Sequence, residues 1–194
     1  SSVAHMGYVM LGIATLTPFG INAAIFGMVA HGLITGMLFF IAGSVKDRYH
    51  TLEIKRLGGL LISAPRLGWI LGLCTMASLG LPGLAGFWGE FPAILAAYEP
   101  APMLNQTLFR VLMVVAALGT VLAAGYLLWL FQRTAFGTPS EEFVDDPEIV
   151  DVKMSEWIAW TPMIVLIVVL GFLPSIIFDV TNPAATLIAA AAGA

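Results

Sequence analysis

Long apolar segments separated by short polar links dominate this chain. Five segments have the length and hydrophobicity of membrane spans, at residues 1–16, 21–45, 67–98, 108–131 and 157–178. Crossing about 30 Å of hydrocarbon takes roughly 20 helical residues, so the first segment is a shortened span. Polar links lie at residues 17–20, 46–66, 99–107 and 132–156. The pattern predicts an all-α, polytopic membrane helix bundle with about five transmembrane helices.

The third apolar segment is too long for one straight span. Its 32 residues would form a helix of roughly 48 Å. Gly80, Pro82 and Gly83 interrupt its centre, and proline removes an amide donor and clashes with the preceding turn. Broken helices at membrane depth occur where the freed backbone groups are buried in protein or line a wet cavity. We therefore expect the third transmembrane helix to be discontinuous.

A single carboxylate, Glu90, follows this break. No other charged residue lies between Arg66 and Glu99, and Glu90 is eight residues before Tyr98, roughly 12 Å from the end of the span. An ionisable residue inside a membrane span is costly and commonly belongs to a proton or ion pathway. We expect desolvation and a cationic or wet neighbourhood to balance at Glu90, so that it loads and releases a proton. The alternative is a structural carboxylate that only hydrogen-bonds the broken backbone.

Two histidines lie inside predicted spans, His5 in the first and His31 in the second. His31 is ten residues from Ile21, roughly 15 Å deep, which is about the depth of Glu90. Histidine titrates near neutral pH and is suited to relaying protons. We expect His5, His31 and Glu90 to form a hydrated polar line across three successive spans. The alternatives are hydrogen bonds that only fix helix packing and, less favoured because no ligand motif spacing is present, a metal site.

Composition and charge agree with a membrane protein and predict its orientation. Hydrophobic residues make up 59% of the chain and charged residues 10%, whereas soluble domains carry about 25% charged residues. Seven lysines and arginines lie in the links 46–66 and 132–156, and only Arg110 lies on the opposite side. The positive-inside rule therefore places these two links in the cytoplasm. The net charge of −4 does not favour nucleic acid, and the single Cys74 excludes an intrachain disulfide.

The two basic links are expected to be peripheral. Residues 51–59 suggest a short interfacial helix, and His50 before them reads as a solvated side chain. The second of these links is strongly acidic, and we expect it to be a solvated surface or a contact with a neighbouring subunit. Its acidic residues are Glu141, Glu142, Asp145, Asp146, Glu148, Asp151 and Glu156.

Four segments, taken in order, resemble the antiporter-like membrane subunits of proton-pumping NADH:quinone oxidoreductase, respiratory complex I. They are SSVAHMG, AHGLITGMLFFIAGSVKDRYHT, LGLPGLAGFWGEF and LGFLPSIIFD. Within that superfamily the chain resembles the chain M family, the bacterial counterpart of mitochondrial subunit 4. Related subunits present a lysine after a GIPP-like break, whereas this chain has GLPG followed by Glu90.

The resemblance implies a role for each candidate residue. Glu90 corresponds to the carboxylate of a discontinuous helix that ends a hydrophilic axis, and His5 and His31 correspond to histidines that line that axis. Residues 1–178 would be the C-terminal part of the proton-translocating membrane domain of a longer subunit. Residues 179–194 would be an extracytoplasmic tail. The family's paired glutamate and lysine, and a further lysine on another helix, would lie upstream.

The resemblance also implies an environment and partners. The chain would be a multi-pass protein of the bacterial plasma membrane, in contact with lipid and with the other membrane subunits of the complex, and would bind no nucleic acid. NADH, FMN, iron–sulfur clusters and quinone would bind to other subunits, with no cofactor and no redox-catalytic residue on this chain.

Three functions remain open at this level. The first is proton translocation within NADH:quinone oxidoreductase, coupled to electron transfer elsewhere. The second is a subunit of a multisubunit cation/proton antiporter or of a membrane-bound hydrogenase. The third is a structural membrane subunit whose polar groups only hold helices together.

Overall fold

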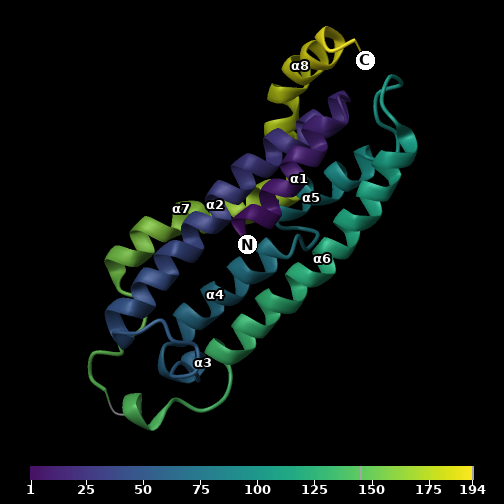
Figure 1. Ribbon diagram of the computed structural model, residues 1–194. Coiled ribbons are helices and arrows are strands. Elements are labelled where there is room, and N and C mark those ends of the chain that lie inside the picture. Colours follow the sequence, from purple (N-terminus) through teal and green to yellow (C-terminus); the bar gives the residue numbers. More distant parts are fainter. Residues whose placement is uncertain (145, 194) are drawn as a thin grey trace.

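The computed structural model describes residues 1–144 and 146–193, and that part of the chain is helical and contains no strand (Figure 1). Asp145 of the acidic link lies outside the described residues. The helices are α1 (Ser2–Ala14), α2 (Pro18–Tyr49), α3 (Leu60–Ser63), α4 (Pro65–Ser78), α5 (Ala85–Ala96), α6 (Gln106–Ala135), the 3-10 helix η1 (Glu141–Phe143), α7 (Met154–Phe172) and α8 (Ser175–Ala191). The prediction of an all-α polytopic bundle is confirmed.

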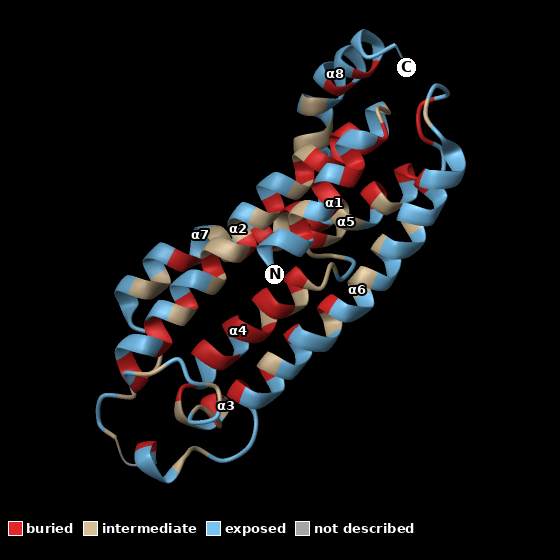
Figure 2. Ribbon diagram, viewed as in Figure 1, coloured by how far each residue is buried: buried red, intermediate tan, exposed pale blue. Residues whose placement is uncertain are grey.

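The outer surface of the bundle is apolar along most of its length. Three of the described helices, α2, α6 and α7, are long and apolar enough to cross a membrane. Most of α6 is exposed (Figure 2), and its exposed residues include Leu118, Val121 and Leu122, which are 61–73% exposed. A surface of this kind is stable against lipid or other apolar helices and unfavourable in water. The chain is a multi-pass membrane protein.

The third span is discontinuous, as predicted. Helix α4 ends at Ser78 and α5 begins at Ala85, and residues 79–84 between them form a non-helical segment of turns. Gly80 and Gly83 within this turn have φ angles of 67° and 92°, in the left-handed region that glycine adopts without a steric cost. With Pro82 unable to donate an amide hydrogen, the sequence ends one helix and starts another at this depth.

The last predicted span is wrong at its C-terminal boundary. The expected helix over 157–178 ends at Phe172, and a separate helix, α8, runs from Ser175 into the predicted tail. Pro174 explains this break, because it cannot supply the amide that would continue the α7 ladder. The two breaks meet in space, since an ideal Cβ on Gly171 would lie 2.1 Å from the carbonyl oxygen of Gly83.

The predicted interfacial helix over residues 51–59 is also wrong. That segment is a loop with one turn at residues 54–56. Gly59 has a φ of 64°, and its amide donates to the carbonyl of Phe136 at 3.0 Å. A tertiary contact with the end of α6 thus replaces the local helix. The two basic links lie together at one end of the bundle, opposite the C-terminus (Figure 1).

Helix α2 is the centre of the bundle and packs against α1, α4, α5, α7 and α8. It crosses α5 closely, because an ideal Cβ on Gly89 would lie 2.4 Å from the Cα of Gly27. Only glycine lets two helix backbones approach this closely. The crossing fixes the position of α5, and therefore of the adjacent Glu90, against α2.

Candidate functional site

His5 and Glu90 are hydrogen-bonded to each other inside the bundle. The Nδ1 atom of His5 on α1 lies 2.6 Å from Oε1 of Glu90 on α5. The side chains are 6% and 14% exposed, so both are largely removed from solvent. A carboxylate and an imidazole at this distance share one proton through a single hydrogen bond.

The helix break and the carboxylate form one structural unit. Because α5 starts at Ala85, Glu90 lies within its second turn and faces back toward the break. An ideal Cβ on Gly80 would lie 3.1 Å from Oε2 of Glu90. Gly80 therefore serves two purposes, because its positive φ makes the turn and its missing side chain leaves room for the carboxylate.

His31 extends the pair along α2. Its ring centroid is 5.5 Å from that of His5, with 41° between the planes. Its Nε2 lies 3.1 Å from the hydroxyl of Ser2, and the hydroxyl of Thr35 lies 3.2 Å from the same nitrogen. The structure thus brings His5, His31 and Glu90 together, with His5 in the middle of the line.

Ser78 is a site residue that the sequence analysis missed. Its Oγ lies 3.2 Å from Nε2 of His5, on the opposite side of the ring from Glu90. The available signal was a hydroxyl residue two positions before Gly80 in an apolar helix. That signal is weak, because serine and threonine in membrane helices commonly bond to their own backbone. Thr75, one turn earlier, does so through the carbonyl of Leu71.

A small cavity joins these groups. Its volume is about 20 Å³, which is enough for one water molecule. The polar side chains that line it are His5, Tyr8, His31, Ser78 and Glu90. Several polar groups around a space of this size are the conditions under which a buried water is stable. A water in this cavity would complete the connection between the two imidazoles.

The acidic link is only partly the solvated surface that was expected. Arg48 on α2 is 4% exposed, and its Nη2 lies 2.7 Å from Oε2 of Glu156, at the start of α7. Asp151 accepts the backbone amides of Arg66 and Leu67 at 3.1 Å and so caps α4. The prediction of a solvated surface is therefore wrong for Asp151 and Glu156. Asp151 is bonded to backbone amides, and Glu156 is bonded to a buried guanidinium.

Other charged residues of the same loops are solvent-exposed, as predicted. His50 and Glu148 pair at 2.8 Å while remaining 71% and 65% exposed. Arg56 and Glu142 also pair on the surface, at 44% and 50% exposure. These contacts join the two basic links without forming a buried site.

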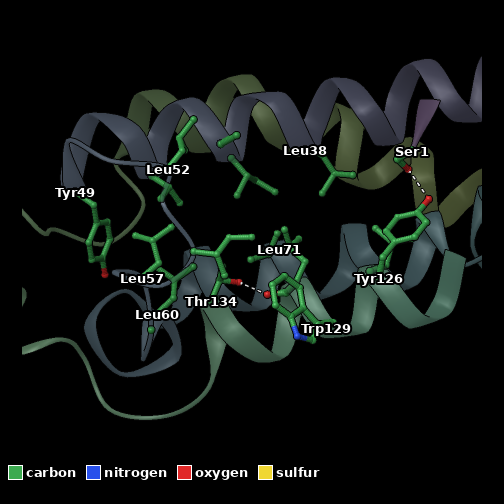
Figure 3. Close-up of a pocket in the computed structure, with 17 residues that line it drawn as sticks. Ser1, Leu38, Tyr49, Leu52, Leu57, Leu60, Leu71, Tyr126, Trp129 and Thr134 are labelled. Carbon is green, nitrogen blue, oxygen red and sulfur yellow. Dashed lines mark hydrogen bonds between the residues drawn. The ribbon is translucent and has the colours of Figure 1, made fainter. Parts of the chain in front are cut away.

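A larger cavity of about 560 Å³ lies between α2 and α6 (Figure 3). Its described lining is apolar except for the hydroxyls of Ser1, Tyr49, Tyr126 and Thr134 and the indole of Trp129. Among these residues there is no carboxylate, imidazole, lysine or arginine. The cavity is therefore separate in chemistry from the His5–Glu90 site.

A broken membrane helix that carries a carboxylate, hydrogen-bonded to a histidine on a neighbouring helix, is an arrangement typical of membrane proteins with a buried ion or proton path. Residues 1–119 match the family described as NADH:quinone oxidoreductase/Mrp antiporter, TM, and the chain belongs to this family. The resemblance seen in the sequence is thus confirmed.

Relatives with similar sequences are named as subunits of quinone oxidoreductases. NADH-quinone oxidoreductase subunit M from Rhodobacter capsulatus is 39% identical over 183 residues, covering 94% of this chain and 34% of that protein. NAD(P)H-quinone oxidoreductase chain 4 2 from Synechococcus sp. (strain JA-2-3B'a(2-13)) is 35% identical, covering 91% of this chain and 33% of that protein. The chain therefore spans about a third of the length of these relatives.

Two solved structures share the fold. A chain of respiratory complex I from Thermus thermophilus with bound NADH is 34% identical, with a TM-score of 0.81, covering 95% of this chain and 37% of that chain. A chain of the Mrp complex from Dietzia sp. DQ12-45-1b has a TM-score of 0.79 at 18% identity, covering 95% of this chain and 41% of that chain. The second likeness is one of fold alone.

Proposed function

We propose that this chain is the C-terminal part of a proton-translocating membrane subunit of NADH:quinone oxidoreductase. The observation that carries the proposal is the 2.6 Å pair of His5 and Glu90 beside the helix break. Family membership supports it, and so do relatives of 32–39% identity that are named as subunits of quinone oxidoreductases.

The geometry supports a relay in which protons move and the heavy atoms stay in place. A proton on the His5–Glu90 hydrogen bond can reside on the imidazole or on the carboxyl group, since the two atoms are already within bonding reach. His31 exchanges protons with Nε2 of His5 through the small cavity, which both imidazoles line together with the Ser78 hydroxyl, 3.2 Å from that nitrogen. Each imidazole takes up a proton at one nitrogen and releases one from the other.

Coupling to redox chemistry takes place outside this chain. We propose that NADH, FMN, iron–sulfur clusters and quinone bind to other subunits, and that energy released there changes the charge next to Glu90. The upstream part of the same subunit would supply the lysine partners. The partners of this chain are then the other membrane subunits of the complex and the lipid bilayer.

The proposed location is the bacterial plasma membrane, with the C-terminus outside the cytoplasm. Support comes from the seven lysines and arginines in the links 46–66 and 132–156. The end of α8 lies at the opposite end of the bundle from those links (Figure 1).

A subunit of a cation/proton antiporter is the second candidate. The family description includes Mrp antiporters, and the Dietzia structure shares the fold. The two candidates differ in their energy source. Proton movement that requires NADH oxidation supports the first, and proton movement driven by a Na⁺ gradient without NADH supports the second.

Glu90→Gln in the full-length subunit of the assembled complex tests the proposal. The amide keeps the size of the side chain and cannot be ionised, so we expect loss of NADH-driven proton uptake into inverted membrane vesicles with the complex still assembled. Glu99→Gln is the matched control, because it makes the same change at an exposed position nine residues later. Unchanged proton uptake in Glu90→Gln would leave the structural role as the better explanation.

A further inference from the structure

Ser78 contacts His5 at Nε2, the nitrogen through which the proposed relay connects His5 to the small cavity and to His31. It is the last residue of α4, its side chain is 7% exposed, and its Oγ lies 3.2 Å from Nε2 of His5. Glu90 occupies Nδ1 of the same ring at 2.6 Å. The His5 imidazole therefore has a carboxylate at one nitrogen and a hydroxyl at the other.

These two partners impose different requirements on the ring. An ionised carboxylate only accepts, so Nδ1 carries a proton when Glu90 is charged. In the neutral ring Nε2 must then accept a hydrogen bond, and the Ser78 hydroxyl donates it. In the imidazolium Nε2 carries a proton as well, and the Ser78 oxygen accepts that bond. Rotation of one hydroxyl hydrogen is enough to pass between the two arrangements.

The same hydroxyl also suits the state in which Glu90 is protonated. The carboxyl group then donates to Nδ1, and Nε2 carries the ring proton and donates to Ser78. A side chain that only donates or only accepts would leave His5 with an unpartnered nitrogen in one of these states. His5 is 6% exposed, and an unpartnered polar group there is unfavourable.

We propose that Ser78 is a positioning residue of the proton relay, holding the ring of His5 against Glu90 and pairing with Nε2 in each protonation state. This inference rests on the proposed function, because it requires that His5 and Glu90 exchange a proton. The ionisable groups facing His5 are Glu90 from α5, His31 from α2 and Tyr8 from its own helix. Replacing Ser78 alters hydrogen bonding within this set without adding or removing an ionisable group.

Ser78→Ala in the full-length subunit of the assembled complex is the test, with NADH-driven proton uptake measured across the neutral pH range. The bond to the imidazolium is charge-assisted and stronger than the bond to the neutral ring. Its loss is expected to move the pH profile of proton uptake to lower pH by roughly half to one unit. Ser78→Thr keeps the hydroxyl and is expected to restore the profile.

Thr75→Val is the matched control. It removes a fully buried hydroxyl from the same helix one turn earlier, and that hydroxyl bonds at 2.7 Å to the carbonyl of Leu71. We expect no shift of the pH profile. In a His5→Ala background Ser78→Ala should add nothing further, because a residue that acts through His5 has no effect once His5 is gone.

The outcomes separate this inference from the proposed function. Suppose that Glu90→Gln abolishes proton uptake, and that Ser78→Ala has the same pH profile as Thr75→Val. The positioning role of Ser78 is then overturned, and the proposed function of the chain stands. If Glu90→Gln leaves proton uptake unchanged, both are overturned. Should Ser78→Ala prevent assembly, Ser78→Cys supplies a weaker partner of similar size. An unshifted profile in that variant would overturn the positioning role.

Discussion

The Nδ1 atom of His5 and the Oε1 atom of Glu90 lie 2.6 Å apart, although 85 positions separate the two residues in the chain. His5 contacts Glu90 directly, whereas His31 is reached through His5 and the small cavity. The two histidines should therefore differ in how much the relay depends on each of them.

We predict that His5→Ala lowers the rate of NADH-driven proton uptake roughly 100-fold, the lower range for a positioned proton-transfer group. His31→Ala should lower it only a few-fold, because water can occupy the enlarged cavity and bridge to His5. Proton uptake into inverted vesicles, normalised to NADH oxidation, measures both. A larger defect in His31→Ala than in His5→Ala would contradict the order of the relay.

Gly80→Ala tests whether the helix break and the carboxylate act as one unit. Alanine at a φ of 67° costs about 1–2 kcal/mol, and its Cβ would lie 3.1 Å from Oε2 of Glu90. We expect a moderate loss of thermal stability and a larger loss of proton uptake, because the carboxylate that bonds His5 has to shift by a few tenths of an ångström.

Gly137→Ala is the control for backbone strain alone. Gly137 has a φ of 85°, and an ideal Cβ there meets no atom within 4 Å. It should show a similar loss of stability with normal proton uptake. Equal proton uptake in the two variants would show that Gly80 acts only through the shape of the turn.

The features that could be predicted from the sequence are those that carry a large free-energy cost at one position of the chain. Glu90 and the glycine and proline residues around it stand out because a charge and a broken helix are both unfavourable inside a membrane. Pro174 carried the same signal for the end of α7. It was missed because the apolar pattern continues through it, and hydrophobicity alone does not show where a helix stops.

Pairings across the bundle could not be predicted in this way. Ser78 lies 73 positions from His5, and Arg48 lies 108 positions from Glu156. Hydroxyls in apolar helices and charges in polar loops are common, and their local sequence does not reveal a buried partner. The acidic link reads as a solvated surface from composition, although Asp151 and Glu156 are held by α4 and α2.

The Arg48–Glu156 pair should stabilise the basic end of the bundle. Arg48 is 4% exposed, and Glu156→Gln would leave its guanidinium buried without a counter-charge. Breaking a buried ion pair costs 3–5 kcal/mol, and we expect about 3 kcal/mol because Glu156 keeps 18% exposure. A lower melting temperature and less assembled complex in the membrane would measure the loss.

Two further variants test whether the loss of stability in Glu156→Gln comes from leaving a buried charge unpaired. Arg48→Met combined with Glu156→Leu should recover part of the loss, since no unpaired charge remains, although the carbonyls of Val150 and Asp151 lose their donor. Glu142→Gln removes the partner of Arg56 at an exposed position and should be nearly neutral. Equal destabilisation by Glu142→Gln and Glu156→Gln would contradict the argument.

Single-cysteine labelling tests the proposed orientation, because the two ends of the bundle carry well-separated exposed positions. Thr138 lies in the acidic link, whereas Met103 lies at the opposite end, where an ideal Cβ on Gly193 is 3.4 Å from its Cε. A membrane-impermeant maleimide should label Met103→Cys in intact spheroplasts and Thr138→Cys only in inverted vesicles. Cys74 is fully buried and should not react in either preparation, so the unmodified protein is the control. Labelling of Thr138→Cys in spheroplasts would show that the chain has the opposite orientation. Protons would then reach Glu90 from the other side of the membrane.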